Sequence, residues 1–144
     1  MSQENVEIVR RAWEAATCRP KPDFTTVNAL YQPDHELISP LSRLEGTTFI
    51  GAQGFRAWLT GVVKDWASWE ARLDRATDVD EDRVLLTWWF IARSKRGGVP
   101  IEQRNALVVT VRDGKVARTE AYSSLEQAVE AVGLSKQEDQ ADSS

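Results

Sequence analysis

The chain has only one cysteine, Cys18, and one histidine, His35, among its 144 residues. A single cysteine cannot form an internal disulfide, and one histidine with one cysteine cannot supply the usual nitrogen and sulfur ligands of a metal site. We therefore expect no metal, no cofactor and no disulfide framework. Few side chains remain that commonly act as bases or nucleophiles.

Long apolar runs and dense basic runs are absent as well. No stretch approaches the roughly 20 apolar residues of a membrane span, and the opening MSQENVE lacks the basic and then apolar order of a signal peptide. Lys and Arg number 18 against 22 Asp and Glu, and the resulting net charge of −4 disfavours nucleic acid as a partner. We expect a cytoplasmic protein that binds neither membranes nor nucleic acids.

Six tryptophans are the most informative residues that the chain does contain. Each one buries roughly 200 Å² or more, so together they form a large part of a core or of a pocket wall. The length suits one domain. We expect that domain over residues 1–134, and a disordered tail over the polar residues 135–144 (SKQEDQADSS).

Three helices are predicted in the first half. Apolar spacing predicts a helix over Ser2–Thr17, and Asp23 is a suitable N-cap for a second helix that ends at Gln32-Pro33. A short strand over His35–Pro40 and a loop containing three glycines follow. The third helix carries an aromatic stripe, which forms either core packing or a pocket wall: Phe55, Trp58, Leu59, Val62 and Trp66.

The apolar period changes from 3.6 toward 2 after Ala67, which predicts an antiparallel meander. Its strands are separated by an acidic turn at residues 78–82 and by two-residue turns at Gly97-Gly98 and Asp113-Gly114. Ser124 opens a capping box for a short last helix that Gly133 closes. The expected strands cover residues 69–74, Arg83–Arg93, Val99–Arg112 and Lys115–Tyr122.

Four segments of the chain point to a particular family with this order of elements: SQENVEIVRRAWEA, GAQGFRAWL, RDGKVARTEAY and EQAVEAVGL. In these segments, from about Ser2 to Leu134, the chain resembles the SnoaL-like branch of the nuclear transport factor 2-like superfamily. The resemblance implies a cone-shaped α+β fold, in which a strongly bent antiparallel meander sheet packs on three N-terminal helices and a short C-terminal helix. It does not imply one function, because this fold hosts isomerases, cyclases, dehydratases and binding proteins.

The resemblance also indicates where catalytic groups would lie. Ketosteroid isomerases of this fold use an aspartate base that falls at about Ser39, and their oxyanion-stabilising tyrosine and aspartate fall at about Trp13 and Leu107. SnoaL-like polyketide cyclases use a histidine and an aspartate that fall at about Leu107 and Ala121. None of Ser39, Leu107 and Ala121 exchanges a proton unaided near neutral pH. Neither mechanism therefore carries over unchanged.

Strand parity indicates which side chains face the cavity of the cone. On Val99–Arg112 the odd positions are more apolar than the even ones, so the odd face is predicted to point inward. A two-residue turn at Asp113-Gly114 would pair odd with even positions, so this register requires a bulge or a three-residue loop. Four outward residues are expected to form one charged ladder, either solvated or in a dimer contact: Glu102, Arg104, Arg118 and Glu120.

The predicted site combines aromatic, amide and hydroxyl side chains. His35 is either an exposed turn residue or a general base at the cavity mouth. Trp69 and Trp89 are expected only to pack. The predicted ligand-binding residues are Trp13, Tyr31, Ser39, Trp58, Trp66, Trp88, Phe90, Gln103, Asn105, Leu107 and Thr119, with His35 as the candidate catalytic residue.

Three functions remain open from the sequence. The first is a binding module that holds a small apolar metabolite among its aromatic side chains. The second is a cofactor-free isomerase, cyclase or dehydratase, in which His35 is the general base and Asn105 and Gln103 orient a carbonyl. The third is a dimerisation domain whose tryptophans fill the core. The resemblance and the outward charged positions also predict a homodimer.

Overall fold

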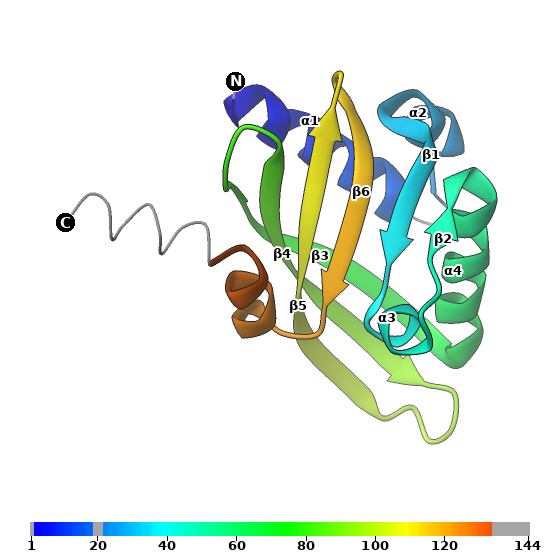
Figure 1. The fold of residues 1–144 in the computed structure, drawn as a ribbon. Coiled ribbons are helices and arrows are strands. Elements are labelled where there is room, and N and C mark those ends of the chain that lie inside the picture. The colour runs from blue at the N-terminus through cyan, green and yellow to red at the C-terminus, as the bar shows by residue number, and fades with distance from the viewer. Residues whose placement is uncertain (1, 19–21, 134–144) are drawn as a thin grey trace.

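Helices and strands alternate in the first half of the chain, and four long strands make up most of the second half (Figure 1). The computed structural model describes residues 2–18 and 22–133, so the tail expected over residues 135–144 lies outside the described residues. The elements are α1 (Ser2–Thr17), α2 (Phe24–Leu30), β1 (Tyr31–Ile38), α3 (Pro40–Glu45), β2 (Phe49–Ile50), α4 (Gly51–Asp65), β3 (Trp66–Asp78), β4 (Arg83–Ser94), β5 (Pro100–Arg112), β6 (Lys115–Tyr122) and a helix over residues 125–133.

One mixed sheet contains all six of these strands, in the order β2-β1-β6-β5-β4-β3. The strands β3 to β6 pair antiparallel with their neighbours in the chain, which confirms the predicted meander. β1 runs parallel to β6, so the sheet as a whole is mixed rather than purely antiparallel. Helices from the N-terminal half and a short C-terminal helix complete the predicted α+β fold.

Different helices cover the two faces of the sheet. On the inner face, α1 contributes Val9 and Ala12 to a buried cluster whose other members come from β4, β5 and β6. On the outer face, Ala128 and Val132 of the last helix pack against Ala106 and Val108. The inner cluster consists of Val9, Ala12, Val84, Leu86, Val109, Val111 and Val116.

The first helix has the predicted bounds, whereas the second is shorter than predicted. The Asp23 carboxylate caps α2 by accepting a hydrogen bond of 3.2 Å from the backbone N–H of Thr26. Tyr31 is already extended (φ −109°, ψ 144°), and Pro33 disfavours a helical conformation of the residue before it. β1 therefore begins at Tyr31 rather than at His35.

The glycine-containing loop that was predicted before the third helix is wrong in part, because it includes α3 and β2. Ser39 and Ser42 form a reciprocal capping box at the start of α3, with hydrogen bonds of 3.1 Å and 2.7 Å. Pro40 occupies the first turn, and Gly46 ends the helix in the left-handed region (φ 72°). These signals were present in the sequence but span only six helical residues.

The third predicted helix, α4, begins earlier and ends earlier than expected. It starts at Gly51, whose φ is +68°, and an added Cβ there would lie 2.9 Å from the carbonyl oxygen of Pro33. It ends at Asp65, so Trp66 is the first residue of β3. The prediction that Trp58 and Trp66 share a helix face is therefore wrong.

The predicted bulge near Asp113-Gly114 is confirmed. Thr110 pairs with Arg118 and Val111 with Val116, so the register shifts by one residue beside the turn. Odd positions consequently pair with odd positions, as in the pair Leu107 and Ala121. The preceding hairpin differs from prediction, because its turn covers residues 95–98 and is closed by a Ser94 N–H to Val99 O hydrogen bond of 3.0 Å.

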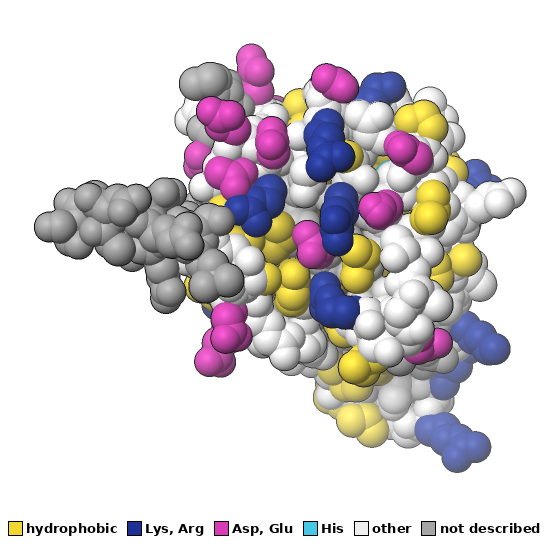
Figure 2. Space-filling model, viewed as in Figure 1, with side chains coloured by type: hydrophobic (Ala, Val, Ile, Leu, Met, Phe, Trp, Pro, Cys, Tyr) yellow, Lys and Arg dark blue, Asp and Glu magenta, His cyan; other side chains and the backbone are white. Residues whose placement is uncertain are grey.

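The single charged ladder that was predicted on the outer face is wrong. Arg118 and Glu120 pair with Thr110 and Val108, and β6 ends before it reaches Glu102. On the face shown in Figure 2, acidic and basic side chains alternate with small hydrophobic areas. Within residues 2–18 and 22–133, no helix is both long and apolar enough to cross a membrane.

Candidate functional site

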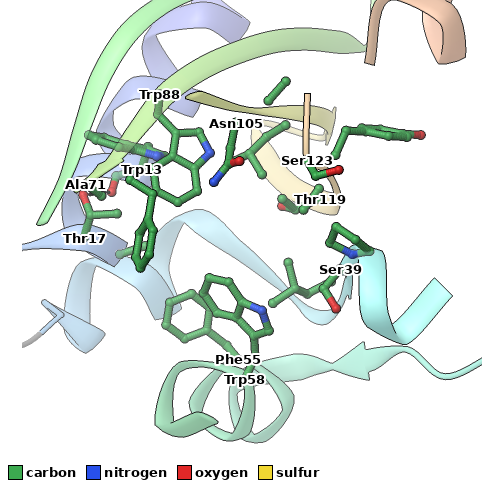
Figure 3. Close-up of a pocket in the computed structure, with 18 of the residues that line it drawn as sticks. Trp13, Thr17, Ser39, Phe55, Trp58, Ala71, Trp88, Asn105, Thr119 and Ser123 are labelled. Carbon is green, nitrogen blue, oxygen red and sulfur yellow. Dashed lines mark hydrogen bonds between the residues drawn. The ribbon is translucent and has the colours of Figure 1, made fainter. Parts of the chain in front are cut away.

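A cavity of about 320 Å³ lies between the inner face of the sheet and the helices α1 and α4. Figure 3 shows Trp88 and Asn105 on one side of this space and Phe55 and Trp58 on the opposite side. Trp88 and Asn105 come from neighbouring strands, and Phe55 and Trp58 lie one helical turn apart on α4. The bend of the sheet therefore leaves an aromatic chamber instead of a filled core.

All twelve residues predicted for the site line this cavity. Their assigned roles in binding or catalysis stay predictions, but the structure brings them together. They are Trp13, Tyr31, His35, Ser39, Trp58, Trp66, Trp88, Phe90, Gln103, Asn105, Leu107 and Thr119.

Several lining residues were missed, and Trp69 is the most instructive. The register of β3 against β4 shifts between Trp66 and Ser68, so Trp66 and Trp69 both face the cavity although they are three residues apart. The expectation that Trp69 only packs is therefore wrong. Trp89 lies on the outer face, because its neighbours Trp88 and Phe90 both face inward. The other missed lining residues are Ala16, Thr17, Leu37, Pro40, Phe55, Ala71, Ala106, Ala121, Tyr122 and Ser123.

Aromatic rings contact one another along the wall. The Phe90 ring lies 5.3 Å from that of Trp66 and 6.0 Å from that of Trp88, both edge to face. Phe55 and Trp58 form a second group, with centroids 6.2 Å apart. Edge-to-face and offset arrangements at these distances are the favoured geometries of aromatic pairs. The wall of the chamber is thus largely aromatic and apolar.

His35 is buried, with 2 % of its surface exposed, so the alternative of an exposed turn residue is wrong. Its Nε2 lies 3.0 Å from the hydroxyl oxygen of Thr119, and its ring packs edge to face on Tyr31 at 4.6 Å. Burial lowers the pKa of His35 from its ordinary value to about 4, although Asp34 acts in the opposite direction. The ring is therefore neutral at neutral pH.

Ser39, where the resemblance predicted that a catalytic base would fall, caps a helix in the structure. Its hydroxyl accepts the hydrogen bond from Ser42 N–H that caps α3, and its residue is 8 % exposed. A capping serine satisfies a helix N–H group and so stabilises the start of the helix. Ser39 therefore caps α3 at the edge of the cavity.

Two buried polar atoms of the cavity wall have no hydrogen-bond partner among the described residues: Nε1 of Trp88 and Oδ1 of Asn105. These two residues are direct partners across β4 and β5, so a donor and an acceptor without partners lie on adjacent side chains. Figure 3 shows both groups at the same side of the chamber. An unpaired buried donor or acceptor costs about 1–3 kcal/mol.

Charged groups are scarce at the site. No Lys, Arg, Asp or Glu occurs among the described residues that line the cavity. The same part of the chain contains no cluster of three or more His, Cys, Asp or Glu side chains that could hold a metal ion. The polar groups of the wall are hydroxyls, amides, an imidazole and indole N–H groups.

Comparison with known protein families identifies the family of this chain. A family model described as the SnoaL-like domain matches residues 9–119. The chain belongs to the SnoaL-like family. Leu107 and Ala121, where the resemblance predicted the cyclase histidine and aspartate to fall, line the cavity, and neither side chain can transfer a proton.

Solved structures of similar fold cover nearly the whole SnoaL-like chain. TerC, co-crystallised with polyporic acid, has a TM-score of 0.70 and 20 % identity over 90 % of this chain and 98 % of that one. A putative SnoaL-like polyketide cyclase from Jannaschia sp. CCS1 has a TM-score of 0.70 and 15 % identity over 91 % and 92 %. A protein of the nuclear transport factor 2-like group from Burkholderia xenovorans LB400 has a TM-score of 0.65 and 26 % identity over 85 % and 90 %. No curated protein matches this SnoaL-like chain.

Proposed function

We propose that this SnoaL-like protein binds a small, uncharged and largely apolar molecule in the aromatic chamber. The cavity of about 320 Å³ has the size of a small-molecule pocket. Its uncharged wall disfavours ions, because an ion would lose its hydration without gaining a partner of opposite charge. The fold neighbour TerC was co-crystallised with polyporic acid, which supports a search for a small-molecule ligand.

The pair formed by Trp88 and Asn105 carries this proposal and defines the polar group of the ligand. The Trp88 indole N–H can only donate, and the Asn105 carbonyl oxygen can only accept. A hydroxyl satisfies both, because its oxygen accepts from Trp88 while its hydrogen is donated to Asn105. A carboxylate lacks the hydrogen, and an ammonium group lacks the acceptor. The proposed ligand is therefore a neutral aromatic or polycyclic molecule with a hydroxyl or enol group.

Calorimetric titration with three naphthalene derivatives tests this ligand chemistry. We expect 2-naphthol to bind, 2-methoxynaphthalene to bind about tenfold more weakly because its ether oxygen cannot donate, and 2-naphthoate not to bind at all. Equal affinities for all three compounds, or tighter binding of the anion, would contradict the proposal.

Replacement of Asn105 by leucine isolates the contribution of the amide. In Asn105→Leu the preference for 2-naphthol over its methyl ether should fall to within about threefold, because the acceptor for the hydroxyl hydrogen is gone. Asn28→Leu is the matched control, since Asn28 is exposed on α2 and lies outside the cavity. A preference that is unchanged in Asn105→Leu would exclude this residue as the anchor.

The contact between His35 and Thr119 favours a second candidate, a cofactor-free isomerase, cyclase or dehydratase. His35 and Thr119 both line the cavity, and the Thr119 hydroxyl lies 3.0 Å from Nε2, so the imidazole would accept a proton from the ligand directly or through that hydroxyl. Deuterium exchange at C1 of 2-tetralone in D2O, followed by NMR, tests this function. Exchange that is accelerated by the wild type and lost in His35→Gln supports an enzyme. Exchange at the rate of buffer alone excludes this chemistry for the probe.

We also propose that the protein is a homodimer. The family resemblance supports this assembly, and so does the outer face of β3, β4 and β5, which carries Trp89 among charged residues and, within residues 2–18 and 22–133, is covered by the last helix only near Ala106 and Val108. Sedimentation velocity at micromolar concentration should show a dimer. A monomer at tens of micromolar protein would refute the assembly, and with it the third function, a dimerisation domain.

A further inference from the structure

The contact between His35 and Thr119 forms a second polar point in the wall of the cavity. Nε2 of His35 lies 3.0 Å from the hydroxyl oxygen of Thr119, and both residues line the cavity. They are buried, with 2 % and 7 % of their surfaces exposed, on the neighbouring strands β1 and β6. Hydrogen-bonding capacity that this pair leaves unused can therefore serve a molecule inside the chamber.

The surroundings of the His35 ring indicate which atom donates in this contact. The ring is neutral at neutral pH, because burial lowers its pKa to about 4, and a neutral imidazole has one N–H, on either Nε2 or Nδ1. Within residues 2–18 and 22–133, Nδ1 has no hydrogen-bond partner. Buried N–H groups without a partner are rarer in folded proteins than acceptors without one. The proton is therefore assigned to Nε2, which donates it to the Thr119 oxygen.

This direction leaves the hydrogen of the Thr119 hydroxyl available. A hydroxyl that accepts from an imidazole N–H still has its own hydrogen to donate, and no other residue in the described part of the chain accepts it. A ketone carbonyl matches such a donor, because it accepts a hydrogen bond and has no hydrogen of its own to place. The cavity thus offers a donor for a carbonyl in addition to the pair that suits a hydroxyl.

The two polar points lie at opposite ends of an apolar stretch of the sheet. Thr119 pairs with Val109, which is four residues beyond Asn105 on β5, so about 13 Å of strand separates them. Between them the paired residues Leu107 and Ala121 line the cavity. Figure 3 shows Asn105 and Thr119 on the same side of the chamber. A flat apolar frame of two or more fused rings would bridge the two points.

We propose that the chamber recognises a hydroxyaryl ketone, whose carbonyl accepts a hydrogen bond from Thr119 while its hydroxyl lies at Trp88 and Asn105. His35 is a positioning residue that orients the Thr119 hydroxyl. This inference rests on the proposed binding function and adds a second anchor to the same cavity. It describes binding and not proton transfer, because an Nε2 atom that already carries a proton cannot accept another.

Calorimetric titration with 6-acetyl-2-naphthol and 6-isopropenyl-2-naphthol tests the second anchor. The two compounds have the same shape, but the isopropenyl group has a CH2 in place of the carbonyl oxygen. We expect the ketone to bind the wild type about fivefold more tightly. In Thr119→Val, which keeps the branched shape without the hydroxyl, the two affinities should agree within about twofold, and Thr119→Ser should retain the preference. Thr110→Val is the matched control, since Thr110 is also buried but lies outside the cavity.

The tautomer of His35 tests the same arrangement without any substitution. His35 is the only histidine in the chain, so the nitrogen NMR signals of its ring identify the protonated atom directly. In the complex of the wild type with 6-acetyl-2-naphthol we expect the proton on Nε2. A proton on Nδ1 would overturn the proposed direction of the hydrogen bond, whether or not the variants fold.

The outcomes separate this inference from the binding function on which it rests. If 2-naphthol does not bind, the proposed function fails and the second anchor fails with it. If 2-naphthol binds but the wild type does not distinguish the ketone from the alkene, only the second anchor is overturned. A preference for the ketone that persists in Thr119→Val would overturn the role of Thr119.

Discussion

Replacing Leu86 with alanine should lower the free energy of unfolding by about 3 kcal/mol. Leu86 is fully buried on β4, at 0 % exposure, within the cluster that joins α1 to the inner face of the sheet. Alanine removes three carbons and leaves a void that the neighbouring strands cannot close, because each is held by its own ladder of hydrogen bonds.

Urea denaturation at one protein concentration measures this loss, since unfolding of a dimer depends on concentration. The midpoint of thermal unfolding should fall by roughly 10 °C. Leu44→Ala is the matched control, because Leu44 is 86 % exposed on α3 and should change the stability by less than about 0.5 kcal/mol. Equal losses in the two variants would contradict the assignment of Leu86 to the core.

Acidification from pH 7 to pH 4.5 should destabilise the wild type by about 2.5 kcal/mol through His35 alone. The pKa of His35 is lowered to about 4 by burial, whereas in the unfolded chain it lies near its ordinary value of 6.5. The unfolded state therefore binds the proton more tightly. The contribution of neutral His35 to the free energy of unfolding is present above pH 6.5 and is lost as the pH falls from 6.5 through about 4.

We assign the loss of stability between pH 6.5 and about 4 to His35 because it is the only histidine in the chain. Hydrogen bonds from Thr26 hold the pKa of Asp23 below its ordinary value of 3.8, and those from Thr87 and Arg104 do so for Asp74. Their stabilising contributions are lost only at still lower pH. The free energy of unfolding should thus fall in two pH ranges. The loss in the upper range follows protonation of the His35 imidazole.

The variant His35→Gln tests the assignment, because glutamine keeps a polar side chain near Thr119 and has no proton to gain. Its stability at pH 7 need not equal that of the wild type; the measured quantity is the slope between pH 7 and pH 4.5. We expect His35→Gln to lose most of that slope in urea denaturation. A variant as acid-sensitive as the wild type over this range would show that His35 is not the buried group responsible.

Local signals predicted those parts of the fold that depend on neighbouring residues. Apolar spacing predicted α1 with its correct bounds, and Asp23 was recognised as the cap of α2. The conflict between strand parity and the Asp113-Gly114 turn predicted a bulge, and the register shift beside that turn confirms it. Parity also predicted that Asn105 and Leu107 face the same side as Thr119, and all three line the cavity.

The errors arise where a distant contact overrides a local pattern. Trp58 and Trp66 have helical spacing, but Trp66 pairs with Ser94 of β4. Trp66 is therefore the first residue of β3 and not part of the helix. The shift between Trp66 and Ser68 then turns Trp69 toward the cavity, against its expected role. Neither effect can be derived from the spacing of residues, because each depends on which strand lies alongside.

The sequence by itself determined the α+β class, the family resemblance and the aromatic, uncharged character of the site, because periodicity, turn residues and composition are local properties. Only the tertiary structure decided that the tryptophans surround a cavity, that His35 is buried against Thr119, and that Trp88 Nε1 and Asn105 Oδ1 have no hydrogen-bond partner within the described part of the chain. These features depend on the bend of the sheet and on contacts between residues far apart in the chain. Burial and hydrogen bonding are set by those contacts, so they cannot be inferred from any single segment.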